Sequence, residues 1–98
     1  MNLEPVVFTE EYEILKELDY ITFYAETLKG RRFPCCIQYR ALEEFFCKSD
    51  DESVFDCFLK EKDTIQNIAR GLIINNDFNN EGVYHIGTDE CIKYENFL

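Results

Sequence analysis

Residues 20–38 read YITFYAETLKGRRFPCCIQ, and this stretch decides the fold. Apolar residues occupy every second position in both halves: Ile21, Phe23 and Ala25 in the first, then Phe33, Cys35 and Ile37 in the second. This period of two is typical of a strand with one buried face. Lys29-Gly30 lies between the halves and favours a turn, because glycine adopts positive φ at little cost. The stretch therefore predicts a β-hairpin whose second strand begins, bulges or lies at an edge at Pro34, which has no amide donor.

The spacing changes to a helical one after the hairpin. Residues 39–47 carry Ala41, Leu42, Phe45 and Phe46 on one face, which predicts a helix. Apolar residues from Val54 to Ile73 follow a 3.6-residue repeat and predict a second helix of about 20 residues. Two pairs, Ser49 with Glu52 and Ser53 with Asp56, each offer capping-box-like chemistry for its start. Asn75-Asn76 offers residues that tolerate a left-handed stop.

The two ends of the chain have weaker patterns. Residues 1–19 are acidic and place Tyr12, Leu15 and Leu18 at helical spacing, which predicts a short helix or turn. Residues 83–86 form a last strand bounded by glycine, whereas the scattered apolar residues of 88–98 predict a partly mobile tail.

The order of elements predicts an α+β fold. Strand, strand, helix, helix and strand imply a small antiparallel sheet, made of the hairpin and a later strand, that a long helix and a shorter helix cover on one face. We expect one domain over residues 1–98, with its α+β core at residues 20–87.

The chain is strongly acidic, with 20 Asp and Glu against 10 Lys and Arg and a formal net charge of −10. The excess acid lies in residues 1–28, 41–56 and 77–98, whereas residues 29–40 are basic. A negative field repels nucleic acid and anionic lipid and attracts basic protein surfaces. We therefore expect no direct nucleic-acid binding and no membrane association. The lack of a long apolar run or a signal-like start favours a cytoplasmic location.

Catalytic arrangements are not recognisable. The five cysteines are odd in number and lack C-x-x-C spacing, which favours reduced, buried thiols over disulfides or zinc. The single histidine, His85, falls in a predicted strand, and the glycines form no phosphate loop. We expect no enzyme, no metal and no cofactor. The enzyme alternative requires a pocket that holds Cys35 or Cys91 beside His85.

A family resemblance covers about Tyr20 to Asp89. Residues 33–42 (FPCCIQYRAL), Phe45-Phe46 and residues 65–69 (IQNIA) resemble a bacterial family, domain of unknown function 1488. In that family a strand with a Val-x-Cys-x-Ile type pattern enters an Ala-Leu helix start, and a helix with Ile-x-x-Ile-Ala precedes a glycine-bounded strand. The acidic N-terminus, the doubled cysteine and the tail depart from the pattern. The resemblance implies an α+β fold and no known activity.

The candidate binding surface is the acid between the two predicted helices: Glu43, Glu44, Asp50, Asp51, Glu52 and Asp56. We expect a non-enzymatic interaction or regulatory protein that docks this acid on a basic protein surface. One alternative is a nucleic-acid mimic that inhibits a DNA- or RNA-binding machine, of the anti-restriction or anti-CRISPR type, and another is a bacterial housekeeping protein. Ordinary solubility also explains such acid. The basic hairpin tip, Lys29, Arg31 and Arg32, is expected to pair internally with the acidic N-terminus.

Overall fold

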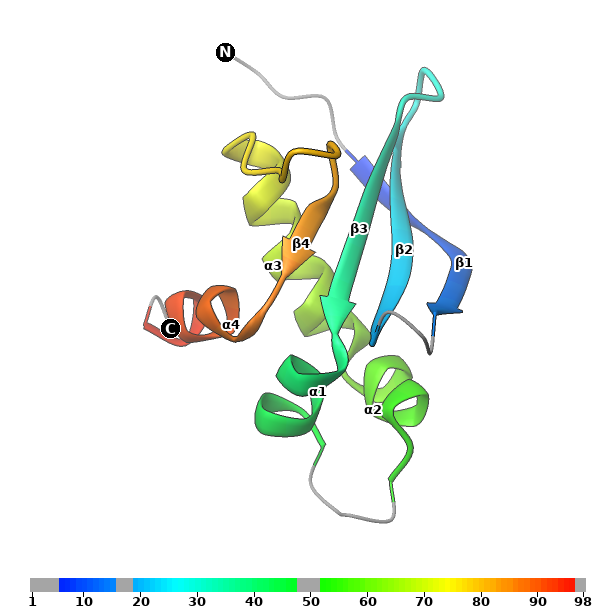
Figure 1. Ribbon diagram of the computed structural model, residues 1–98. Helices are drawn as coiled ribbons and strands as arrows, with labels where there is room; N and C mark the ends of the chain where they lie inside the picture. The colour runs from blue at the N-terminus through cyan, green and yellow to red at the C-terminus, as the bar shows by residue number, and fades with distance from the viewer. Residues whose placement is uncertain (1–5, 16–18, 48–51, 97–98) are drawn as a thin grey trace.

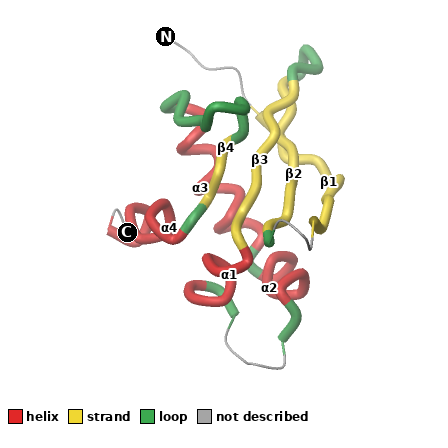
Figure 2. Tube along the Cα trace, in the orientation of Figure 1, coloured by secondary structure: helices red, strands yellow, loops and turns green. Residues whose placement is uncertain are grey.

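The computed structural model describes residues 6–15, 19–47 and 52–96, and these residues form an α+β fold (Figure 1). Its elements are β1 (Val6–Leu15), β2 (Tyr20–Thr27), β3 (Arg32–Gln38), α1 (Tyr39–Phe45), α2 (Val54–Lys60), α3 (Lys62–Ile74), β4 (Tyr84–Ile86) and α4 (Thr88–Asn96). The four strands form one sheet in the order β1-β2-β3-β4. α3 lies behind this sheet, and α1 and α2 lie at one end of it (Figures 1 and 2). The described helices are all too short or too polar to cross a bilayer.

The predicted hairpin is confirmed. β2 and β3 pair antiparallel, and the residues of the expected inner face, Ile21, Phe23, Ala25, Cys35 and Ile37, are fully buried. Gly30 has φ 84° and its amide donates to the Thr27 carbonyl at 3.0 Å, which closes the turn. Pro34 lies opposite Tyr24 and one residue before the pairing of β3 with β4 begins. β3 has no neighbouring strand on that side at Pro34, so the missing amide is tolerated.

The N-terminal segment is a strand, so the predicted helix near residues 10–18 is wrong over the described part, and residues 16–18 lie outside it. β1 pairs antiparallel with β2, and its register passes from Phe8↔Ala25 to Tyr12↔Phe23. Two extra residues of β1 therefore form a bulge, which returns Tyr12 to the face that Phe8 occupies. Both side chains pack on the core. The helical spacing of Tyr12, Leu15 and Leu18 begins only after this bulge, and Leu18 lies outside the described residues.

The single helix predicted from Val54 to Ile73 is in fact two helices. α2 and α3 are separated at Glu61, whose φ of −105° and ψ of 19° lie outside the helical range. Phe58 in α2 packs against Phe23 of the sheet with ring centroids 5.5 Å apart, whereas Ile65, Ile68, Ala69 and Ile73 of α3 line the core. Phe58 and Ile65 are seven residues apart, a spacing that also suits one straight helix, so the pattern concealed the break.

Both predicted helix ends are confirmed. Ser53 caps α2, because its Oγ accepts from the Asp56 amide at 3.1 Å, whereas the alternative cap, Ser49, lies outside the described residues. At the other end, Asn76 adopts a left-handed φ of 54° after α3.

The C-terminal part differs from the prediction in two ways. β4 pairs parallel with β3, so the sheet is mixed rather than wholly antiparallel. The chain reaches β4 through the preceding helices, and such a crossover delivers a strand in the parallel sense. Residues 88–96 form α4 in place of a mobile tail. Its start is fixed because the Gly87 amide donates to Glu90 Oε1 at 2.8 Å, and the buried Cys91 attaches it to the core.

Candidate functional site

The candidate acid gathers at the end of the molecule that α1 and α2 form (Figure 1). The turn between β1 and β2 belongs to the same end, because the Tyr39 amide at the start of α1 donates to the Asp19 carbonyl at 2.8 Å. We call this region the acidic end and define it by its described carboxylates: Asp19, Glu43, Glu44, Glu52 and Asp56. Asp19 was not among the predicted site residues. Its backbone has a left-handed φ of 56°.

The predicted site residues have different surroundings within the acidic end. Glu43 on α1 and Asp56 on α2 are exposed. Glu44 accepts a hydrogen bond from Arg40 Nε at 3.0 Å, one helical turn away. Glu52 accepts from Lys60 Nζ at 2.7 Å, and only 15 % of its side chain is exposed. Asp50 and Asp51 lie outside the described residues.

The carboxylates of the acidic end fall into two groups, those in ion pairs and those exposed to solvent. The hydrogen bond to Glu52 raises the pKa of Lys60, which keeps Lys60 charged at neutral pH. Glu52 is directed inward to hold α2, whereas Glu43 and Asp56 project into solvent. Among the described residues of the acidic end, Glu43 and Asp56 are therefore exposed to solvent, whereas Glu44 and Glu52 are paired with Arg40 and Lys60.

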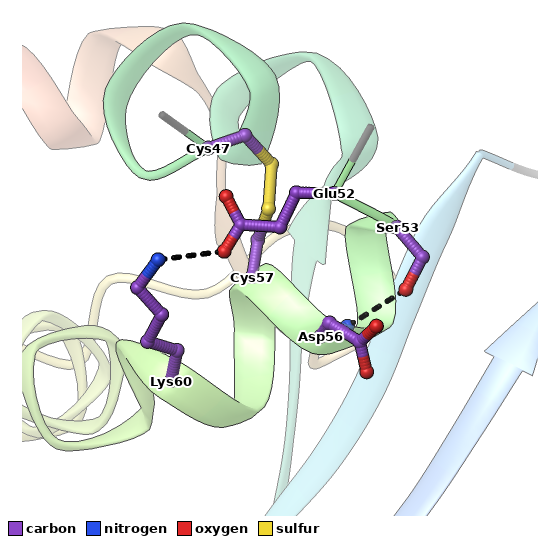
Figure 3. The surroundings of a disulfide bond; sticks show 6 residues. All are labelled: Cys47, Glu52, Ser53, Asp56, Cys57 and Lys60. Atoms are coloured by element: carbon purple, nitrogen blue, oxygen red, sulfur yellow. Dashed lines mark hydrogen bonds and ion pairs between the residues drawn. A yellow bond between two sulfur atoms is a disulfide. The ribbon is translucent and has the colours of Figure 1, made fainter. Parts of the chain in front are cut away.

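A disulfide joins Cys47, just after α1, to Cys57 in α2 (Figure 3). The two Cα atoms are 5.3 Å apart, and Cys57 is fully buried. The prediction of five reduced thiols is wrong for this pair. Cysteine spacing gave no sign of it, because Cys47 and Cys57 meet only when α1 and α2 pack together. Figure 3 shows Glu52 and Lys60 beside the bridge; their ion pair joins the segment before α2 to the end of α2, whereas the disulfide links α1 to α2.

The remaining cysteines, Cys35, Cys36 and Cys91, are buried thiols. Burial raises the pKa of Cys35 to about 12 and that of Cys36 to about 11, so both are protonated at neutral pH. His85 lies opposite Cys36 in the β3–β4 register, whereas Cys35 lies opposite Tyr84. Within the described part of the chain, no three Asp, Glu, Cys or His side chains lie close enough to hold a metal ion.

The basic hairpin partly neutralises the N-terminal acid, as predicted. Arg32 Nη2 donates to Glu11 Oε2 at 2.8 Å, and this bond raises the pKa of Arg32. Arg32 also lies 4.5 Å over the ring of Tyr24. Glu11 is thereby drawn toward the hairpin, and it does not add to the acidic end.

Comparison with known proteins gives a family and a fold. The family model described as "Protein of unknown function (DUF1488)" matches residues 6–86. A crystal structure of a DUF1488 protein of unknown function from Shewanella loihica PV-4 is similar, with a TM-score of 0.73 and 25 % sequence identity. The similarity covers 88 % of this chain and 94 % of the Shewanella chain. No curated protein matches.

Proposed function

We propose that this chain, which belongs to the DUF1488 family, is a small non-enzymatic binding protein that docks its acidic end on a basic surface of a partner protein. The observation that carries the proposal is the exposure of Glu43 and Asp56 on two neighbouring helices, in a chain of net charge −10. Charge of one sign on one end of a domain steers association with a surface of the opposite sign.

The construction of the acidic end supports a binding function. α1 and α2 are linked by the Cys47–Cys57 disulfide, and α2 is capped by Ser53. Helices fixed in this way present their carboxylates with little loss of conformational entropy on binding. The protonated state of the buried thiols supports the non-enzymatic part of the proposal, since the thiolate is the nucleophile in cysteine catalysis.

Nucleic-acid mimicry is the more specific alternative, and the ion pairs of the acidic end argue against it. Duplex DNA presents one charge per about 1.7 Å of its axis, so a mimic needs closely spaced carboxylates without cations between them. Arg40 and Lys60 neutralise Glu44 and Glu52. We therefore propose docking on a protein surface and treat displacement of DNA from a captured partner as an outcome of the test.

A pull-down with two charge-matched variants tests the proposal. The acidic-end variant is Glu43→Gln/Asp56→Asn. The control is Glu81→Gln/Asp77→Asn, which removes one exposed Glu and one exposed Asp beyond the C-terminal end of α3. Both variants have the same net charge, so any difference between them comes from position.

We expect the wild-type chain and the control to retain the same lysate protein at low salt and to release it at high salt, because exposed charges are screened. The acidic-end variant should fail to retain it. Equal retention by both variants, or no salt-sensitive partner of the wild-type chain, would overturn the proposal. If added duplex DNA displaces the partner from the wild-type chain, the captured surface is a nucleic-acid site and mimicry replaces our proposal.

A further inference from the structure

A second site lies at the opposite end of the sheet from α1 and α2, between the β2–β3 hairpin and the loop that precedes β4 (Figure 1). It is a pocket of about 220 Å³ whose lining side chains are Arg31, Arg32, Phe33, Pro34, Phe78 and Tyr84. The Tyr84 ring meets Phe33 and Phe78 edge to face, with centroids 6.0 and 5.7 Å away. Phe33 and Tyr84 are buried, whereas 53 % of Phe78 is exposed. The pocket thus has an aromatic base and one aromatic side open to solvent.

Arg31 supplies the charge of this pocket. Its guanidinium lies 4.9 Å from the centroid of the Phe33 ring. Across the described residues, no carboxylate lies within ion-pair range of Arg31, whereas Arg32 is paired with Glu11. Burial raises the pKa of Tyr84, so the phenol keeps its proton at neutral pH. The pocket therefore offers a guanidinium and a neutral hydroxyl as donors.

Both walls of the pocket are fixed by hydrogen bonds. On the hairpin side, the Arg31 amide donates to Thr27 Oγ1 at 3.1 Å, and the Thr27 amide donates to the Arg31 carbonyl at 2.9 Å. On the loop side, Asn79 Oδ1 accepts from the amides of Glu81 at 2.9 Å and Val83 at 3.0 Å. A site whose walls are already ordered loses little entropy when a ligand enters.

We propose that this pocket binds a small aromatic carboxylate, with the carboxylate on Arg31 and the ring against Phe33 and Phe78. Arginine is the side chain best shaped for a carboxylate, because its planar fork donates two parallel hydrogen bonds. Aromatic rings favour edge-to-face and offset contacts with a further ring. The volume lies below the roughly 300–1,000 Å³ typical of drug-sized sites, so it suits a single ring with a short acid. Such a group occurs in free aromatic acids and in chains that end in an aromatic residue.

Titration of the full chain with phenylacetate, followed by amide chemical shifts in nuclear magnetic resonance, tests the site. We expect saturable shifts at Arg31, Gly82 and Tyr84, with a dissociation constant on the order of 1 mM for a ligand of this size. Phenylacetamide has the same ring without the charge and should bind at least about tenfold more weakly. Arg31→Gln should weaken phenylacetate binding to a similar extent.

Two further variants complete the test. Arg40→Gln removes an exposed arginine at the other end of the molecule and should leave the affinity unchanged. Phe78→Ala removes the exposed aromatic side without opening the core, and it should weaken both ligands. Equal binding of phenylacetate and phenylacetamide, an Arg31→Gln variant with the wild-type affinity, or an equal loss in Arg40→Gln would overturn the proposal.

Peptides distinguish the source of the ligand. A short peptide that ends in a free Phe carboxylate should bind like phenylacetate, and its C-terminal amide should not. Tighter binding of the peptide than of phenylacetate identifies a protein C-terminus as the ligand, whereas weaker binding identifies a free acid. This pocket does not involve the acidic end, so the failure of either proposal leaves the other intact.

Discussion

Breaking the Cys47–Cys57 disulfide should destabilise the protein by about 2.7 kcal/mol. The bridge joins residues ten apart in sequence. The loss of loop entropy in the unfolded chain for a loop of that length corresponds to about 2.7 kcal/mol at 25 °C in the chain-entropy description. Cys47→Ala is the better substitution, because Cys57 is fully buried and its replacement also disturbs the core.

Guanidinium denaturation with and without a phosphine reductant measures this loss. The reductant should lower the free energy of unfolding of the wild-type chain and leave Cys47→Ala unchanged, since that variant has no bridge to reduce. The unfolded, unreduced chain should show three reactive thiols, Cys35, Cys36 and Cys91, and the reduced chain five. Five thiols before reduction, or a wild-type transition that the reductant does not move, would refute the reasoning.

The disulfide also bears on the cellular location. Most cytosolic thiols are kept reduced by glutathione, so a cytoplasmic location, as we predicted from the sequence, is unusual for a chain with a structural bridge. Extraction in the presence of an alkylating reagent traps the thiols as they are in the cell. Alkylation of Cys47 would show that the bridge is open there, in which case the acidic end is held by Lys60–Glu52 and packing alone.

Three other perturbations follow from the packing and the buried thiols. Phe58→Ala should lower the free energy of unfolding by about 3–5 kcal/mol in chemical denaturation. Leu59→Ala changes its half-exposed neighbour and should lower it by less than about 1 kcal/mol. Equal losses in the two variants would contradict the place of Phe58 in the core. Ser53→Ala should lower the free energy of unfolding by about 1 kcal/mol, because the cap of α2 is lost. An unchanged denaturation midpoint would contradict a stabilising cap at Ser53. Because the pKa values of Cys35 and Cys36 are raised from 9.0 to about 12 and 11, the unfolded chain releases these protons first. Their contribution to stability should be complete below pH 9 and decline as the pH rises toward 11, and a rise in stability over that range would contradict their burial.

The local elements were largely predictable from the sequence. The hairpin followed from the alternation of Ile21, Phe23 and Ala25 together with the turn at Gly30, and both features depend only on neighbouring residues. The cap at Ser53 is equally local. The order of elements and the family resemblance both implied the α+β fold, which the structure confirms, and the match over residues 6–86 confirms the family.

Long-range features were not predictable from the same patterns. The bulge in β1 between Phe8 and Tyr12 is visible only once β2 is its partner. The break at Glu61 is hidden because Phe58 and Ile65 are seven residues apart, a spacing that also suits one straight helix. The disulfide requires α1 and α2 to meet, and no sequence spacing records that. The sequence likewise identified the acidic residues, but it could not distinguish the exposed Glu43 and Asp56 from Glu44 and Glu52, which form ion pairs.

The docking surface at the acidic end is tested most directly by measuring the affinity of a captured partner for the two charge-matched variants. Glu43→Gln/Asp56→Asn should weaken binding by about tenfold at low salt, since two exposed charge contacts together contribute on the order of 1–2 kcal/mol. Glu81→Gln/Asp77→Asn should bind within about twofold of the wild-type chain, a difference below 0.5 kcal/mol by the same conversion. Equal affinities for the two variants would contradict a docking surface at the acidic end.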